Sequence, residues 1–512
     1  MRRGVAGIAV AGLLVTSVGL GMALAQGKPP AAGAPGGGKP APVAPGPAPG
    51  DKFANPPSAV APPPATMPDK FASPPPSAAA PPVAAIPGEP EALTRLRAML
   101  GREVTLTYRA LAPVDPAGGA VRLSGVSLRR GEITIGIEEL TLDRPGEDQM
   151  GEAVALGVTI GGAGATPALI GRIQLEGFRL RRPAAGEALA PGDLTVDLLR
   201  LEGLAVQGET PFAIATLTVE DWAAGKPGRF TLTGLDVLTP AAGLVDRLRL
   251  GRIALRGYDL PTMLAAVIAR TPPPQPGGEV GMEVEDVAAT LGGAAIGSLG
   301  SLRISAEAPA GGVPGGAQSG RIALRDLRVA PFPLIAPWLT RFGYTELTGD
   351  ITIEARVDPA AERMDLSSFA VSARGMGGLG LSMQLEGVST DPGRIADNAE
   401  RMRLAGATLR YVDQSLFGRW VADQARQQRV PEARLREQYA SMAAAAVIQG
   451  QRDAGPLAPA LAAVQRFLRG QARTLEVSLR PPQPVPVADF AGLGAAGPVE
   501  AQRRLGLEVT AQ

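Results

Sequence analysis

One short pattern recurs along the chain and restricts the fold more than any other feature. It reads apolar-x-Leu-x-Gly-apolar-x-apolar, and its clear copies begin at Val121, Ile173, Leu199, Phe230, Ile253 and Ile322, the last with Asp at the glycine position. Within each half of the unit, apolar and polar residues alternate, as in a strand that buries one face. The pattern predicts repeated antiparallel strands and a mainly β fold.

The central glycine separates two runs of opposite parity. In one copy the apolar residues are Ile173 and Leu175 before the glycine, and Phe178 and Leu180 after it. In a regular strand this change turns the apolar side chains to the opposite face. One extra residue in a β-bulge restores the face, and Gly, or less readily Asp, adopts the left-handed conformation that such a bulge needs.

We therefore expect bulges or tight bends at the centre of each unit and of two weaker copies. The candidate positions are Gly125, Gly177, Gly203, Gly234, Gly257, Asp326, Gly387 and Gly406. The alternative is a hairpin turn at each of these positions, which would leave very short strands. The irregular spacing of the units argues against a solenoid of fixed period. We predict a long, curled antiparallel sheet with one apolar face.

The sequence divides into segments of different character. Residues 91–512 form the β-rich body, within which residues 415–470 predict a helical insert. Ser415 is placed to cap its first helix, and Pro431 opens the second. Leu435, Tyr439 and Met442 follow the 3-4 spacing of an apolar helical stripe. The insert is expected to cover one end or face of the sheet.

The N-terminal residues predict export. Residues 1–25 combine two arginines, an apolar stretch and Ala23-Leu24-Ala25, which is the pattern of a cleaved signal peptide. An uncleaved inner-membrane anchor is the alternative, and both place the body in the periplasm. Residues 26–90 are rich in Pro, Ala and Gly and predict a disordered linker. A Phe-containing unit repeats within it, either to bind a partner or as a duplicated spacer.

The chain has no histidine and no cysteine, which excludes several classes of site. Disulfides, thiolate or imidazole metal sites and His-dependent catalytic triads need these residues. We expect no catalytic residues, no cofactor and no metal. Gly375, Gly377 and Gly380 match a dinucleotide-binding spacing, but a strand pattern follows where a helix is needed, so a hairpin loop is the better interpretation. A net charge of +1 does not favour nucleic acid.

Residues 331–342 are the most aromatic stretch of the body. Such a stretch either contacts a partner or a membrane, or packs beneath the sheet.

Two phrases, Leu347-Thr-Gly349-Asp350 and Met383-Gln-Leu-Glu-Gly387, together with the repeated strand units, resemble AsmA-like and YdgA-like envelope proteins of Gram-negative bacteria. The segment that begins at Leu409 is similar to the C-terminal part of uncharacterised members. The resemblance spans residues 100–512. It implies an apolar β-groove for lipid transport or outer-membrane assembly, and it brings no catalytic residues. Those proteins usually keep a membrane anchor and lack a long Pro-rich linker.

Three hypotheses follow. The first is a non-enzymatic periplasmic protein whose apolar β-surface binds lipid or an envelope protein, with peripheral membrane contact. The second is an envelope scaffold whose Pro-rich arm binds the cell wall or a partner. The third is a hydrolase that uses carboxylates alone, which requires two acids facing one cleft.

Overall fold

The computed structural model describes residues 89–101, 103–115, 119–163, 165–183, 189–239, 245–271, 277–309, 316–389, 398–448, 454–490, 492 and 497–512. The predicted signal segment 1–25 and almost all of the linker 26–90 lie outside the described residues.

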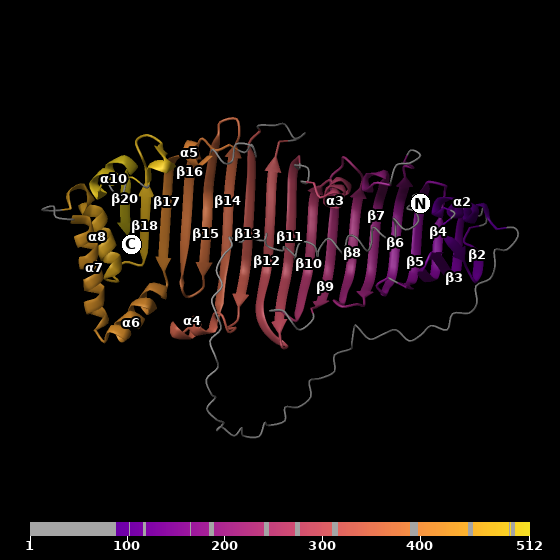
Figure 1. Ribbon diagram of the computed structural model, residues 1–512, viewed down its shortest axis with the longest axis horizontal. Helices are drawn as coiled ribbons and strands as arrows, with labels where there is room; N and C mark the ends of the chain where they lie inside the picture. The colour runs from indigo at the N-terminus through magenta and orange to yellow at the C-terminus, as the bar shows by residue number, and fades with distance from the viewer. Residues whose placement is uncertain are drawn as a thin grey trace, which may run out of the picture.

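The described residues form one long antiparallel sheet of twenty strands that does not close into a barrel (Figure 1). Its strands are β1 (Thr105–Thr107), β2 (Ala110–Pro113), β3 (Ala120–Arg130), β4 (Ile133–Asp143), β5 (Gln149–Gly162), β6 (Ala168–Leu180), β7 (Leu194–Val206), β8 (Phe212–Trp222), β9 (Gly228–Leu238), β10 (Arg247–Tyr258), β11 (Gly278–Leu291), β12 (Ala294–Ala308), β13 (Gln318–Val329), β14 (Leu347–Asp358), β15 (Arg363–Ala373), β16 (Gly377–Glu386), β17 (Arg403–Asp413), β18 (Thr474–Leu479), β19 (Val485–Pro486) and β20 (Leu507–Ala511). The predicted mainly β, antiparallel fold is confirmed.

The topology is a meander. Each strand from β3 to β17 pairs with the strand before it and the strand after it. The short strands β1 and β2 share the free edge of β3, while β20 pairs with β18 at the other end and β19 pairs with β17. Hairpins make this arrangement possible because antiparallel neighbours need only short connections.

Helices lie mainly at the two ends of the sheet (Figure 1). Their bounds are α2 (Glu91–Leu100), α3 (Leu260–Ala269), α4 (Ala336–Arg341), α5 (Asn398–Arg401), α6 (Leu416–Gln428), α7 (Glu432–Ile448), α8 (Ala458–Leu468) and α10 (Pro498–Leu505). α2 is at the indigo end, and α6, α7 and α8 are at the yellow end. The helices expected within residues 415–470 are therefore present.

Two details of that helical segment differ from expectation. Ser415 makes no capping hydrogen bond to α6; the Asp413 carboxylate instead accepts from the Phe417 N–H at 2.8 Å, and the Ser415 hydroxyl donates to the Gly375 carbonyl. On α7, Leu435 is fully buried but Met442 is 58% exposed. Ala440 is fully buried and Ala443, Ala444 and Val447 are half-buried, so the covered face of α7 continues through these residues and does not include Met442.

The strands keep their register through Gly125, Gly177, Gly203 and Gly234 of the repeated unit. Ser124 and Val126, on either side of Gly125, pair with Glu139 and Ile137, so the register is the same before and after the glycine. Gly125 nevertheless has φ +60°. The alternative of a hairpin turn at each glycine is therefore wrong, and the arrangement also differs from a bulge of two residues against one.

The register is kept because the alternation of apolar and polar residues changes parity in each strand at a residue that lies opposite the same change in the neighbouring strand. One residue per strand marks this level across β3–β13, and we call the set the parity line: Gly125, Glu138, Gly157, Gly171, Gly203, Ala215, Gly234, Gly251, Asp286, Gly300 and Asp326. Every second member is left-handed, from Gly125 through Gly157, Gly203, Gly234 and Asp286 to Asp326. The strands between them contribute the other members of the line. These members are Gly or Ala, with the exception of Glu138.

A second line of the same kind crosses β6–β10 nearer the strand ends. Its left-handed members are Gly177 (φ +62°), Asp221 (φ +56°) and Gly257 (φ +81°). A true register shift accompanies Gly257, and others occur at Asp326 on β13 and beside Gly406 on β17. Gly387 (φ +74°) follows the end of β16, whereas Gly406 is not left-handed.

Candidate functional site

The apolar face carries two rows of side chains that cross the sheet from strand to strand. One row runs Leu232, Ile253, Val284, Leu302, Leu324, Ile351, Val371, Leu379, Tyr411 and Leu475, and the other runs Phe230, Leu255, Met282, Ile304, Ile322, Ile353, Phe369, Leu381, Leu409 and Val477. Members of a row face the same side because residues paired across an antiparallel ladder share a face. The period-2 pattern of each strand is thus aligned over the length of the molecule.

Over β3–β9 this face is closed. Leu123, Leu201 and Leu217 are at most 2% exposed, and they belong to one continuous core cluster. Leu93 and Leu96 of α2 join the cluster at one end, and Leu260 and Leu264 of α3 join it at another point. The curl of the sheet and these two helices together remove the apolar side chains from water.

An apolar cavity of about 160 Å³ remains within the closed part. Its walls are side chains of β3–β6 and of α2, and all of them are aliphatic, Met or Phe. That volume is close to the roughly 150 Å³ of an engineered apolar cavity that stays dry and binds benzene. The cavity therefore has the size and the lining to hold part of an apolar chain.

The C-terminal segment covers only the far end of the apolar face. Phe467 of α8 packs on Tyr411, with ring centroids 5.8 Å apart, and the same cluster includes Leu475 and Val509. Residues 485–490 cover a second corner, where Leu385 and Leu404 are buried. The helical insert thus caps the sheet rather than filling its face.

Between these covers, the face is open over β11–β16. We call the following residues the open band: Met282, Val284, Leu302, Ile304, Ile322, Leu324, Ile351, Ile353, Phe369, Val371, Leu379 and Leu381. None of them is fully buried, and Leu379 is 39% exposed. No helix in the described part of the chain packs on the centre of this band.

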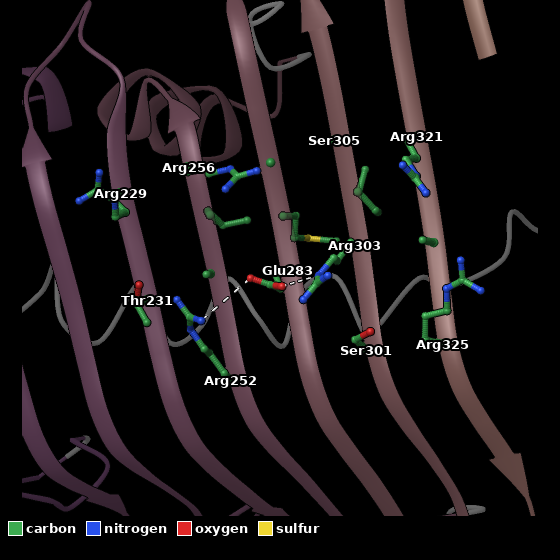
Figure 2. Close-up of a pocket in the computed structure, with 16 residues that line it drawn as sticks. Arg229, Thr231, Arg252, Arg256, Glu283, Ser301, Arg303, Ser305, Arg321 and Arg325 are labelled. Carbon is green, nitrogen blue, oxygen red and sulfur yellow. Dashed lines mark hydrogen bonds and ion pairs between the residues drawn. The ribbon is translucent and has the colours of Figure 1, made fainter. Parts of the chain in front are cut away.

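The opposite face of the neighbouring strands β9–β13 holds a hollow of about 630 Å³ (Figure 2). Six arginines line it, and we call it the arginine hollow: Arg229, Arg252, Arg256, Arg303, Arg321 and Arg325. Its floor is made of small side chains, among them Ala254, Gly281, Ser305 and Ala323. Long side chains around short ones produce the depression on an otherwise regular sheet.

Four of the arginines stand at the corners of a rectangle. Arg252 and Arg325 share one row, which passes through Glu285 and Ser301, and Arg256 and Arg321 share another, which passes through Gly281 and Ser305. Three strand spacings separate the members of each pair, or about 14 Å. Glu283 and Arg303 lie between the rows.

The carboxylates around the hollow hold its arginines with unequal strength. Arg303 lies 2.6 Å from Glu283, whereas Arg252 approaches Glu285 and Glu283 only to 3.8 and 4.0 Å. Arg325 is 3.8 Å from Asp350. The hydrogen bond from Arg303 lowers the pKa of Glu283. Glu283 is thereby held ionised, which suits an ion pair and not a general acid.

The eight positions singled out from the sequence shape the sheet and do not line either surface depression. Gly125, Gly203, Gly234 and Asp326 come together in the parity line, and Gly177 and Gly257 belong to the second line. Gly387 and Gly406 lie farther along, at β16 and β17. No member of the eight lines the apolar cavity or the arginine hollow.

Sequence reasoning missed the arginine hollow although the sequence carries a signal for it. The pentapeptide Arg-Ile-Ala-Leu-Arg occurs twice, as residues 252–256 on β10 and 321–325 on β13. Its Ile and Leu belong to the repeated strand pattern and lie on the apolar face. The two arginines and the alanine between them lie on the other face, because alternate residues of a strand point the same way.

The aromatic stretch 331–342 does not pack beneath the sheet. Its helix α4 lies at the strand ends next to α6 (Figure 1), where Arg341 forms an ion pair with Asp423 at 2.7 Å and Arg419 stacks over the Tyr344 ring at 4.2 Å. Trp338 remains 42% exposed and Leu334 81% exposed.

Residues 370–512 match the model of a family described as uncharacterized protein. No curated protein matches the chain. The helices in the described ranges are all too short or too polar to cross a bilayer. Those ranges also contain no cluster of three or more acidic side chains arranged to hold a metal ion.

Proposed function

We propose that this protein is a non-enzymatic component of the cell envelope that binds the acyl chains of lipids on its apolar face. The open band carries the proposal: two aligned rows of aliphatic side chains that no described helix covers at their centre. Contiguous apolar surface of this kind marks a binding site on a soluble domain. Residues 1–25 support export, and an AsmA-like groove would serve the same role.

The dimensions suit a lipid chain. From β11 to β16 there are five strand spacings, or about 24 Å at about 4.8 Å each. One leaflet of a bilayer core is about 15 Å deep, so an acyl chain lying across the strands fits within the band. The apolar cavity beneath α2 lies at the closed end of the same face, and α8 bounds the other end.

Adjacent residues of β12 offer a matched test. Ile304 belongs to the open band, whereas Ser305 points to the opposite face, between Arg256 and Arg321. Ile304→Glu puts an ionised carboxylate where the acyl chain would lie, and Ser305→Glu adds the same charge on the other side of the same strand. We expect Ile304→Glu to reduce lipid uptake by about tenfold, since burying an unpaired polar group costs at least about 1.4 kcal/mol.

The measurement uses the full chain purified from cells and follows uptake from vesicles of pyrene-labelled diacylglycerol, which has acyl chains but no phosphate for the arginine hollow to bind; bound lipid is identified by extraction and mass spectrometry. Wild type and Ser305→Glu should carry lipid alike. A folded wild-type protein that arrives empty and takes up no labelled lipid would overturn the proposal, as would equal uptake by both variants. Circular dichroism checks that Ile304→Glu keeps its strands.

A further inference from the structure

We propose that the arginine hollow binds a compact anion that carries several phosphate groups. The hollow lies on the face opposite the open band, so this inference is independent of the proposed lipid function. It rests on the arrangement of Arg229, Arg252, Arg256, Arg303, Arg321 and Arg325 around a floor of small residues (Figure 2).

The lining is strongly cationic although the whole chain is nearly neutral. The residues that line the hollow include six arginines and one acid, Glu283. The other carboxylates that pair with these arginines stand outside the lining: Glu220, Glu279, Glu285, Glu354 and Asp350. A ligand in the hollow therefore meets six arginines, and the carboxylates nearest its centre are Glu283 and Glu285, which approach Arg252 and Arg303 to between 2.6 and 4.0 Å.

The existing ion pairs leave the guanidinium groups able to take a ligand. The side chains of Arg252, Arg256 and Arg325 are 45%, 67% and 49% exposed, and their nearest carboxylates are 3.5 Å or farther away. Exposed pairs of this kind contribute little to stability. Phosphate oxygens accept two parallel hydrogen bonds from one guanidinium, which a distant carboxylate does not match.

The size and symmetry of the hollow favour several phosphates over one. The volume of about 630 Å³ is far more than a single phosphate fills. Arg252 and Arg325 lie opposite Arg256 and Arg321, with the Glu283–Arg303 pair between the two rows, so separate phosphates of one molecule can reach separate corners. A ligand with phosphates on a compact scaffold meets that geometry, because the charged groups of the lining other than Glu283 are arginines placed around it and its apolar residues are limited to Leu255, Met282, Ile304 and two alanines.

The test measures binding of inositol hexakisphosphate and of orthophosphate to the full chain by isothermal titration calorimetry. Inositol hexakisphosphate should bind at one site, at least about tenfold more tightly than orthophosphate, because several charge-assisted contacts act together. Affinity should fall as salt rises, since the screening length shrinks from about 10 Å at 0.1 M to about 3 Å at 1 M.

The double variant Arg252→Gln/Arg325→Gln should weaken this binding by at least about tenfold, the effect of losing a charge-assisted contact. The matched control is Arg122→Gln/Arg200→Gln, which removes the same charge from the same face of β3 and β7. The control should bind like wild type. Absence of binding to wild type, or an equal loss in both doubles, overturns the proposal.

A further arm identifies the source of the phosphates. The protein is mixed with vesicles of phosphatidylglycerol. If it binds them, and if inositol hexakisphosphate displaces wild type but not the Arg252→Gln/Arg325→Gln variant, the phosphates belong to lipid headgroups. Binding of inositol hexakisphosphate without such vesicle binding places them on a soluble molecule. Both results support a phosphate site in the hollow. Uptake of phosphate-free diacylglycerol, which tests the open band, is unaffected by either.

Discussion

The sheet has a closed half, β3–β9, and an open half, β11–β16, built from the same strand pattern. In the closed half, Leu201 is 1% exposed, whereas Leu379 in the open half is 39% exposed although it too faces the apolar side. The closed half contains both lines of left-handed residues, β11–β13 contain only the parity line, and β14–β16 contain neither. Register shifts, which bend strands, are not confined to the closed half: one accompanies Gly257, and others lie between β14 and β15 and between β15 and β16. The comparison indicates that the apolar pattern alone does not decide where the face closes, and that α2 and α3 help to close it over β3–β9.

The most direct way to break this comparison is to make one substitution in both halves. Leu201→Ala should lower the free energy of unfolding by about 3 kcal/mol, because it leaves a cavity in a closed core. Leu302→Ala in the open band should cost about 1 kcal/mol, because the side chain is only half-buried and water fills the space. Chemical denaturation of the two variants gives both values.

Equal losses in the two variants would mean that the open band is covered in solution. A dependence of the Leu302→Ala loss on protein concentration would then identify a second copy of the chain as the cover, and the idea of an open face would fail.

A second prediction concerns the bends. Gly203 of the parity line has φ +67°, and a Cβ there would meet nothing closer than 3.6 Å. Gly203→Ala should therefore cost only the price of the left-handed conformation, about 1–2 kcal/mol. Gly203→Asp should cost less, because Asp occupies the same level in the open half at Asp286 and Asp326.

Thermal unfolding of the two Gly203 variants gives the difference. If Gly203→Asp proves as costly as Gly203→Ala, then local packing rather than backbone conformation sets the residue at this level, and the parity line is not a backbone device.

The smallest predicted effect concerns the cover of the closed end. The Glu89 carboxylate accepts hydrogen bonds from Arg97 of α2, at 2.9 and 3.1 Å, and from the Tyr108 hydroxyl at 3.0 Å. The hydrogen bond from Arg97 is the main cause that lowers the pKa of Glu89. A lowered carboxyl pKa stabilises the fold above the unfolded value of about 4.3, and this contribution is lost as pH falls through the folded-state pKa.

Glu89→Gln should therefore destabilise the protein by about 1 kcal/mol at neutral pH, the usual net value of such a bond. The variant should match wild type once the pH is below the folded-state pKa. Denaturation midpoints measured from neutral to acidic pH check this, and a constant difference across that range would contradict it.

Local signals in the sequence were enough to predict the strands and most helices. Alternation identified β4 and β14, and Pro431 marked the start of α7. The change in the alternation of apolar and polar residues at Gly125 was visible as well. Its structural basis was not, because it depends on a matching change at Glu138, the residue opposite on β4. Register is a property of a pair of strands and cannot be read from one of them. The arginine hollow escaped for the same reason, because its corners, such as Arg252 and Arg325, come from strands far apart in the chain.

The capping of α6 gives a smaller example. Ser415 has the right residue type for a helix cap, yet its hydroxyl binds Gly375 and Tyr344, which the β15–β16 hairpin and α4 bring close. Asp413 performs the capping instead. Tertiary partners decided between two residues that local propensity could not separate.

The meander has a consequence for how the chain reaches its structure. Every strand from β4 to β16 pairs only with its immediate predecessor and successor, so each strand pair joins two segments that are neighbours in the sequence. Contact order is accordingly low for an all-β chain of this length, and folding can start at any hairpin and extend in both directions. Such a sheet also tolerates the gain or loss of a whole hairpin. Its length is then free to change while α2 and α8 cover the apolar face at its two ends.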